Sequence, residues 1–396
     1  MKRFIKYIPL LFLLACQDLA DLQPSETDTY AKFFGDPGDN YGVTLKETPS
    51  GDMLLLGYNE KADGSLKSYL IRTDSYGNLI TSFGTNGTLT IPGMKATDLA
   101  INSNGYYIIG DSIYLSSLNE EQSHMMLVKS STSGQRSGQV TIDSVVLTGT
   151  NTIHGSAILV EDDDEVIALG YQTIGINNNL IYLQYSFTQS SVQWVERIND
   201  RSYTPGKALV QNYADSKYNW VASSLEGYGF KAGPNEPQSG NIPLPDVTTA
   251  IDLDVNINNN RLGGIGNNSN GNLVFYEMDP SGGKLDFVSS NVLKTTIKVG
   301  ESDQEISGTA QSISQVMTGG YIVLATVNEN FILYRTDYQG QLTKPFTFAK
   351  YIDWVSRETS GAAIGTTDGG YAVFGSSEAG GASMMVLIKT DKNGNL

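Results

Sequence analysis

Histidine chemistry has few candidates in this sequence. The 396 residues include only two histidines, His124 and His154, so a His-based catalytic triad or a multi-histidine metal site is poorly supplied. We interpret both as strand or loop residues without a catalytic role. The sequence also lacks a Gly-x-Ser-x-Gly nucleophile elbow and a phosphate-binding P-loop. Catalysis by a pair of carboxylates stays open because acidic residues are plentiful, although no pair stands at a suggestive spacing.

Two acidic strings could bind calcium, a cation that takes several convergent oxygen ligands. The first, Glu-Asp-Asp-Asp-Glu at 161–165, precedes an apolar run. The second, Asp-Leu-Asp-Val-Asn-Ile-Asn at 252–258, alternates polar and apolar residues and lacks the glycine of a calcium loop. We interpret the first as a solvated turn and the second as a strand. We therefore predict no metal site and no cofactor, with calcium as the alternative.

Cys16 is the only cysteine, and the residues before it suit an exported protein. Three basic residues open the chain, and the apolar run at 7–14 is too short to span a bilayer, which takes about 20 helical residues. The Leu-Leu-Ala at 13–15 together with Cys16 resembles the lipobox cut by the lipoprotein signal peptidase, which implies lipid on Cys16. A lone thiol also leaves no disulfide and no cysteine-based metal site. The alternative is an ordinary signal peptide with a chance cysteine.

These features divide the chain into three predicted parts: a lipoprotein signal peptide at 1–15, a flexible acidic tether at 16–28 and a folded domain at 29–396. The tether is polar and has no apolar period. In some Gram-negative bacteria, acidic residues soon after the lipidated cysteine accompany export to the cell surface, and Asp18 and Asp21 are a weak version of that signal. We expect an outer membrane lipoprotein, periplasmic or surface-exposed with the surface favoured, that contacts the membrane through its lipid anchor only.

The charge balance argues against nucleic acid as a partner. The net charge is −16, and removal of residues 1–15 takes away three basic residues, leaving 23 basic against 42 acidic residues and a net charge of −19. A strongly acidic protein repels phosphate backbones. The 42 glycines and 22 tyrosines favour strands and turns over helices.

A repeated strand and turn define the expected fold. Seven short apolar strands each follow a turn and end on a small residue, 43 to 60 residues after the previous one. These closing residues are Gly57, Gly110, Gly170, Ser223, Gly266, Ala325 and Gly375. Most copies continue with a second strand that runs into a turn with Asp at its start and Gly three residues later. Four strands per repeat at a period near 50 residues predict an all-β, seven-bladed β-propeller, with six or eight blades as alternatives.

The turn aspartates have a structural explanation. An Asp at the first turn position accepts backbone N–H groups, and a Gly three residues later tolerates the unusual φ. We predict this role, rather than a catalytic one, for four residues: Asp74, Asp279, Asp337 and Asp391.

The chain ends predict a closed ring. Residues 78–84 follow the second element of the first repeat and are predicted to form its fourth strand. The last repeat reaches residue 396 without such a strand, whereas residues 30–35 precede the first repeat and match the Phe-Gly end of that strand. We therefore expect the N-terminal strand to complete the last blade, which removes an open sheet edge. The fourth repeat departs from the pattern and carries a Pro- and Gly-rich stretch at 227–245.

Two of the repeat strings suggest a family. The Asp-Gly-Gly-Tyr at 368–371 and the Leu-Ile-Lys-Thr-Asp-Lys-Asn-Gly-Asn at 387–395 resemble the repeats of bacterial β-propeller lipoproteins and secreted proteins, a family of largely unassigned function. The resemblance covers the chain from about residue 30 to residue 396. It implies a propeller and an envelope location, and it implies no activity.

The leading functional hypothesis is a non-enzymatic module that binds a protein or a glycan at the cell envelope. The alternatives are an extracellular carbohydrate-active hydrolase or lyase with carboxylates in the propeller funnel, and a structural subunit of an envelope complex. Tyr58, Tyr114 and Tyr171 lie at or just after the apolar strands, near the face that carries loops of variable length, so we predict them as contact residues, with local packing as the alternative. Trp194 and Trp354 are predicted to pack between blades.

Overall fold

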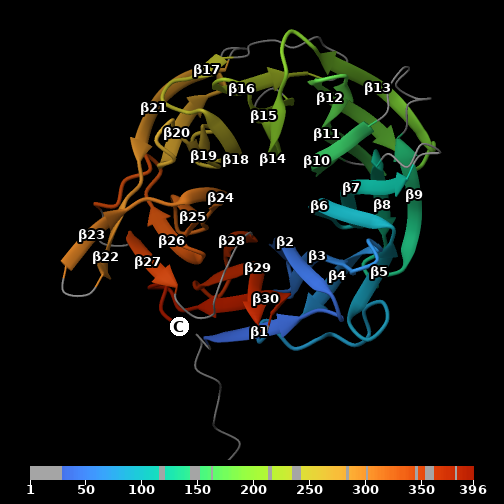
Figure 1. Cartoon of the computed structure of the whole chain (residues 1–396), viewed down its shortest axis with the longest axis horizontal. Coiled ribbons are helices and arrows are strands. Elements are labelled where there is room, and N and C mark those ends of the chain that lie inside the picture. The colour runs from blue at the N-terminus through green and yellow to red at the C-terminus, as the bar shows by residue number, and fades with distance from the viewer. Residues whose placement is uncertain are drawn as a thin grey trace, which may run out of the picture.

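The described residues form a ring of β-sheets. The computed structural model describes residues 29–115, 121–142, 152–161, 164–212, 216–233, 242–281, 285–299, 302–343, 347–352, 361–379 and 381–396. Within these ranges seven four-stranded antiparallel sheets surround a central axis (Figure 1). The prediction of a seven-bladed β-propeller is confirmed. None of the described residues forms a helix long and apolar enough to cross a membrane.

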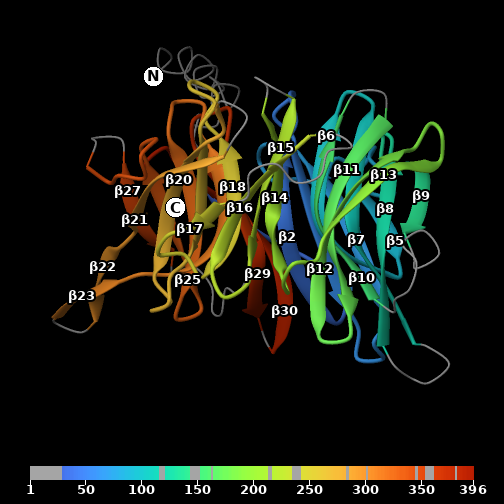
Figure 2. The same cartoon turned by 90° about the horizontal axis from the view of Figure 1, so that it is seen from above.

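In blades 1 to 6 the strands run from the centre outward in chain order, whereas the outer strand of blade 7 comes from the start of the described chain. The strands extend between the two faces of the ring (Figure 2). Blades 1 to 3 consist of β2 (Asp39–Glu47), β3 (Met53–Glu60), β4 (Leu66–Thr73) and β5 (Thr88–Pro92); β6 (Met94–Asn102), β7 (Gly105–Leu115), β8 (Glu121–Ser130) and β9 (Arg136–Ile142); and β10 (Thr152–Val160), β11 (Glu165–Ile174), β12 (Asn177–Ser186) and β13 (Ser191–Ile198). Blades 4 and 5 consist of β14 (Thr204–Asn212), β15 (Lys217–Ser223), β16 (Gly227–Ala232) and β17 (Ile242–Leu244); and β18 (Thr249–Val255), β19 (Leu262–Asn267), β20 (Leu273–Asp279) and β21 (Asp286–Val292). Blades 6 and 7 consist of β24 (Thr309–Gln315), β25 (Tyr321–Val327), β26 (Asn330–Thr336) and β27 (Phe348–Ile352); and β28 (Gly361–Gly365), β29 (Tyr371–Ala379), β30 (Ala382–Thr390) and β1 (Tyr30–Phe34).

The ring closes through its N-terminal strand. β1 pairs antiparallel with β30, from Tyr30 opposite Lys389 to Phe34 opposite Met385, and supplies the outer strand of blade 7 (Figure 1). This confirms the predicted closure. At the centre of the ring, blade 7 approaches blade 1 so closely that a Cβ atom at Gly42 would lie 2.4 Å from the Gly375 carbonyl oxygen. Glycine is therefore required at this contact.

Large side chains from the middle strands fill the spaces between blades. Trp220 of blade 4 stacks on Phe230 and lies 4.8 Å from the ring of Tyr182 in blade 3. Trp194, on the outer strand β13, meets Tyr182 edge-on at 5.3 Å, so its predicted packing between blades is confirmed. Such aromatic contacts stabilise beyond the area that they bury. Trp354 lies outside the described residues.

The turn aspartates act as predicted. Asp74 Oδ1 accepts the backbone N–H groups of Tyr76 and Asn78, at 3.0 and 2.8 Å. The corresponding bonds occur at Asp279, Asp337 and Asp391. Gly77 has a φ of 72°, in the left-handed region that favours glycine. These carboxylates hold tight turns together.

Blade 1 differs from the sequence-based expectation. Its outer strand is β5, and the predicted strand at 78–84 is instead a loop. Phe83 in this loop is 1% exposed and packs into the core between blades 1 and 2, which draws the segment inward. Gly84 and Gly87 then take positive φ angles that return the chain to the sheet. The prediction of a strand at 78–84 was wrong. The Phe-Gly pair at 83–84 resembles the end of a strand, but Phe83 is a loop residue that is buried in the core.

Two further features concern blades 4 to 6. The Pro- and Gly-rich stretch at 227–245 contributes β16 and β17, so blade 4 is a complete blade. Between blades 5 and 6, the hairpin β22 (Thr295–Val299) and β23 (Ser302–Ile306) forms a two-stranded sheet that projects from the ring (Figure 1). Nothing in the repeat pattern indicated this insertion.

Candidate functional site

The strand order gives the propeller two different faces. The hairpins between second and third strands, such as 61–65 and 175–176, open on one face, which we call the variable-loop face. The hairpins between first and second strands, such as 48–52, lie on the opposite face, the tight-turn face, together with the Asp74 and Asp391 turns. Because Tyr30 pairs with Lys389, next to the Asp391 turn, the chain enters β1 from the tight-turn face.

Aromatic side chains gather where the inner strands reach the variable-loop face. The Tyr58 ring stacks on Tyr41 of the inner strand, with centroids 4.8 Å apart, and Lys95 Nζ of blade 2 lies 5.3 Å from the Tyr58 ring centre. In blade 3, Tyr171 stacks on His154 at 4.6 Å. We call Tyr41, Tyr58, His154 and Tyr171 the aromatic rim. Burial raises the pKa of Tyr58 and of Tyr171, so both phenols stay neutral hydrogen-bonding groups at neutral pH.

The three predicted contact tyrosines lie on neighbouring blades. Tyr58 and Tyr171 are near the ends of β3 and β11, and Tyr114 is near the end of β7 between them. The side chain of Tyr114 lies outside what the structure describes. Sequence reasoning missed Tyr41, and it assigned no role to His154, whose Nδ1 lies 2.8 Å from Asp111 Oδ2 in blade 2.

In blades 2, 4, 5 and 7, the residue at the position equivalent to Tyr58 forms a hydrogen bond to the next blade. This residue is the one after the closing small residue, except in blade 4, where it is the closing residue Ser223 itself. Its side chain accepts a hydrogen bond from a backbone N–H group on the inner strand of the next blade. Such bonds join Asp111 to Gly155, Ser223 to Ala250, Asn267 to Ala310 and Ser376 to Gly42, at 2.8 to 3.1 Å. In blade 1 the bond comes instead from Ser68 on β4, which accepts from the Ala96 N–H at 2.9 Å. Position 58 is thereby free of the bridging role and can hold a tyrosine.

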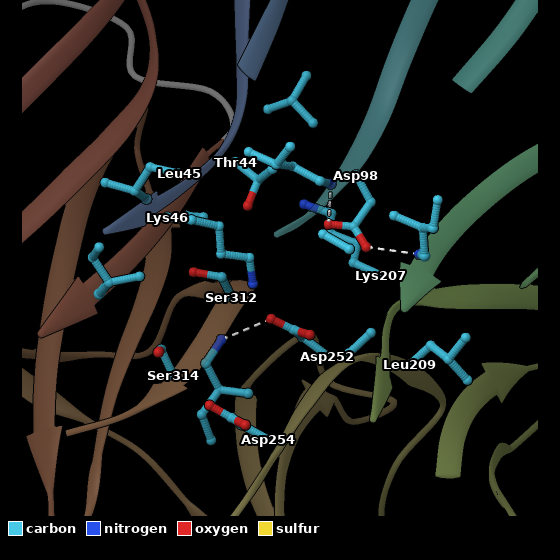
Figure 3. Close-up of a pocket in the computed structure, with 18 of the residues that line it drawn as sticks. Thr44, Leu45, Lys46, Asp98, Lys207, Leu209, Asp252, Asp254, Ser312 and Ser314 are labelled. Carbon is cyan, nitrogen blue, oxygen red and sulfur yellow. Dashed lines mark hydrogen bonds between the residues drawn. The ribbon is translucent and has the colours of Figure 1, made fainter. Parts of the chain in front are cut away.

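A charged cavity of about 400 Å³ occupies the central channel between the inner strands (Figure 3). Its charged side chains come from blades 1, 2, 4 and 5, and we call them the channel cluster: Lys46, Asp98, Lys207, Asp252 and Asp254. Among the described lining residues, the carboxylates are accompanied by lysines and by neither arginine nor tyrosine.

The channel carboxylates bind backbone groups of neighbouring blades. Asp98 Oδ2 accepts the Ile158 N–H of blade 3, and Asp252 Oδ2 accepts the Ile313 N–H of blade 6, both at 2.9 Å. Asp254 Oδ2 accepts the Gln315 N–H at 2.7 Å. Each carboxylate therefore ties one inner strand to the next, which is a structural role.

Burial in the channel shifts the pKa values of four members of the channel cluster. Burial raises the pKa of Asp98 to about 6 and that of Asp252 to about 7, although Lys46 and Lys207 oppose the shift. Burial also raises the pKa of Asp254 and lowers that of Lys207. Both lysines keep exposed surface within the channel, so water reaches the cluster and moderates the loss of hydration.

These shifts predict that the fold becomes more stable as the pH falls toward 5. A carboxyl group whose pKa is higher in the folded state binds protons more readily there, so its contribution is fully present below the unfolded pKa and is lost as the pH rises through the folded value. Because each pKa unit corresponds to about 1.4 kcal/mol, folded values of about 6 and about 7 should raise the free energy of unfolding by up to about 4 kcal/mol between about pH 8 and about pH 5. Urea denaturation at both pH values measures it.

The variant Asp252→Asn should remove about two thirds of this pH dependence, because it removes the carboxyl group with the higher of the two folded pKa values. The control is Asp63→Asn. Asp63 is exposed, and its pKa is lowered by the hydroxyl and N–H of Ser65, so it does not titrate in this range. A pH slope that is the same in Asp252→Asn as in the native chain would contradict the assignment.

The two possible calcium strings are engaged in other contacts where they are described. Gln184 Nε2 donates to Glu161 and Glu165 at 2.8 and 2.7 Å, and Lys129 Nζ lies 2.5 Å from Asp164 Oδ2. The string at 252–258 begins within β18, as the strand interpretation predicted. Among the described residues, no group of three or more His, Cys, Asp or Glu side chains is arranged to hold a metal ion.

Comparison with known proteins relates the chain to other proteins by structure alone. No protein-family model matches the sequence, and no curated protein matches it. Among solved structures, the WD40 β-propeller domain of Doa1 has a TM-score of 0.53 at 9% sequence identity, over 91% of this chain and 96% of that one. The periplasmic gluconolactonase PpgL of Pseudomonas aeruginosa has a TM-score of 0.51 at 14% identity, over 78% of this chain and 88% of that one. At identities this low, the chain shares with these proteins the β-propeller fold and nothing more specific.

Proposed function

We propose that this chain is a lipid-anchored propeller of the cell envelope or cell surface that binds a protein or a glycan on its variable-loop face and catalyses no reaction. The observation that carries the proposal is the aromatic rim. Its rings lie on blades 1 and 3 near the variable-loop face, whereas the positions equivalent to Tyr58 in blades 4 to 7 hold the small polar residues Ser223, Asn267, Thr326 and Ser376.

The rim suits recognition because its rings are held in place before a partner arrives. Tyr58 is fixed against Tyr41, and Tyr171 against His154. Tyrosine offers a large contact area and a hydroxyl group at a small cost in side-chain entropy, which is why it is common at the centres of interfaces.

Exposed apolar side chains extend the same surface over blades 3 and 4. Ile176 and Leu225 lie at the tips of two second-to-third hairpins and are 96% and 92% exposed. Scattered exposed apolar residues are normal on a protein surface. Two of them at hairpin tips of neighbouring blades, on the face that carries the aromatic rim, favour a partner that covers this part of the face.

The predicted anchor favours the same face. The 13 residues between Cys16 and Tyr30 can span at most about 45 Å, and the chain enters β1 from the tight-turn face. Lipid on Cys16 would therefore turn the tight-turn face toward the membrane and leave the variable-loop face open to partners. An outer membrane location at the cell surface is part of this proposal.

The test is partner capture from solubilised membranes with the native chain and with a Tyr58→Ala, Tyr171→Ala double variant. We expect the double variant to bind at least about 30-fold more weakly, because removing two central aromatic contacts costs about 2 kcal/mol or more. The matched control is Tyr76→Ala, which removes a 44% exposed tyrosine from a turn on the tight-turn face.

The control variant should retain the partner, and all variants should first be shown to melt within a few degrees of the native chain. Equal capture by the native chain and the double variant would overturn the proposal. So would cross-links that place the partner wholly on the turns at 74–77 and 391–394.

A carbohydrate-active hydrolase or lyase is the second candidate, and the channel cluster favours it. A carboxyl group with a pKa of about 7, as at Asp252, could donate or accept a proton near neutral pH. Activity toward an extracellular glycan that disappears in Asp252→Asn and persists in the rim double variant would replace the binding proposal with this one.

A further inference from the structure

A cavity on the tight-turn face has the opposite charge from the rest of the molecule. It lies between blades 6 and 7 and has a volume of about 550 Å³. Three of its described lining residues are Arg335, Lys350 and Lys392, and none is Asp or Glu. In a chain with 42 acidic and 26 basic residues, a cavity whose charged side chains, among the described lining residues, are all cations favours an anionic occupant.

The turn beside this cavity differs in sequence from the equivalent turns of blades 1 and 7. In blade 7, Lys389 pairs with Asp368 of the first-to-second-strand turn at 2.9 Å. Blade 1 makes the equivalent pair between Arg72 and Asp52 at 2.6 Å. Each of these turns therefore supplies a carboxylate to the basic residue of the third strand.

Blade 6 keeps the basic residue, Arg335, and its turn has a threonine where blade 7 has an aspartate. Its turn reads Thr-Gly-Gly-Tyr at 318–321, where blade 7 reads Asp-Gly-Gly-Tyr at 368–371. Arg335 donates to Thr318 Oγ1 at 3.3 Å and to the carbonyl oxygens of Gly319 and Thr336. These bonds fix the guanidinium at the cavity, and the threonine brings no negative charge to it.

Aromatic rings form another part of the wall. Phe348 and Tyr371 meet edge-on, with centroids 5.5 Å apart. Burial raises the pKa of Tyr371, so its phenol is neutral. Thr347 and Asn393 add uncharged polar groups to the lining. An apolar ring surface, hydrogen-bonding groups and a guanidinium together suit a ligand that carries a carboxylate on a ring with polar edges.

We propose that this cavity binds an acidic sugar, a carboxylate-bearing pyranose residue, either free or at the end of a glycan. Lys350 and Lys392 would contact the carboxylate, and the buried Arg335 guanidinium would add positive charge behind them. The aromatic wall would contact the face of the sugar ring. The site lies on the opposite face from the aromatic rim, so it is a second binding site that does not depend on the function proposed above.

The test is calorimetric titration of the folded protein with glucuronate, with glucose as the uncharged probe and inorganic phosphate as the simple anion. We expect glucuronate to bind at least tenfold more tightly than either. Thr318→Asp introduces the carboxylate that blade 7 already has, and it should weaken glucuronate binding at least tenfold. Ser103→Asp, which adds the same charge to an exposed tight turn of blade 2, should leave it unchanged.

Lys350→Gln provides a second variant that does not alter the turn, and it should also weaken glucuronate binding if the cavity is the site. The proposal is overturned if glucuronate does not bind, if glucose binds as tightly, or if phosphate binds in preference. It is also overturned if both cavity variants bind glucuronate like the native chain.

Discussion

Deleting residues 29–35 should lower the melting temperature by at least about 5 °C and promote self-association. The deletion removes β1, which pairs along its whole length with β30 and brings Tyr30, Ala31 and Phe34 against the core of blades 6, 7 and 1. Without it, β30 becomes an open edge whose unpaired backbone groups can recruit a strand from another molecule. Thermal melting and sedimentation of the soluble protein measure both effects.

The control is deletion of residues 17–27, which we predict to belong to the tether. Because those residues precede the first described strand, their loss should leave the melting temperature unchanged. Equal melting temperatures for the two truncations would show that β1 does not secure the ring.

Replacing Cys16 by alanine should move the protein from the membrane fraction to the soluble fraction. Acyl chains contribute about 0.8 kcal/mol for each buried CH₂ group, and the variant can receive none of them at this position. Nothing in the described part of the chain offers a membrane-spanning helix as a substitute. Fractionation of cells, together with metabolic labelling by a fatty acid, measures the change.

Ser25→Ala, a neutral change in the same predicted tether, serves as the control and should stay in the membrane fraction with its label. A Cys16→Ala protein that remains firmly in the membrane, with unchanged processing, would rule out the lipid anchor.

The fold could be predicted from the sequence mainly through the second and third strands of the blades. In every blade, the second and third strands are buried between neighbouring blades, so their apolar runs and closing small residues recur along the sequence. The turn aspartates recur because each turn needs the same backbone contacts. Outer strands have fewer constraints, which is why β5 was misplaced and the β22–β23 hairpin was not foreseen.

The candidate site was only partly predictable. Tyr58 and Tyr171 could be found because they follow closing glycines, whereas their stacking partners, Tyr41 and His154, lie on inner strands without a common motif. Most inner strands contain a bulge that shifts the pairing by one residue. Such a shift decides which side chains reach the channel, so Asp98 and Lys207 could not be recognised without the register.

The closure of blade 7 also determines how the molecule would bear mechanical force. If the tether pulls on Tyr30 while a partner holds the variable-loop face, the tension runs along β1, parallel to the strands. Hydrogen bonds between antiparallel strands lie perpendicular to them, so the five residue pairs between β1 and β30 would share the load in shear rather than separate one after another. The strand that closes the ring is thus pulled in the direction in which a strand pair resists rupture best.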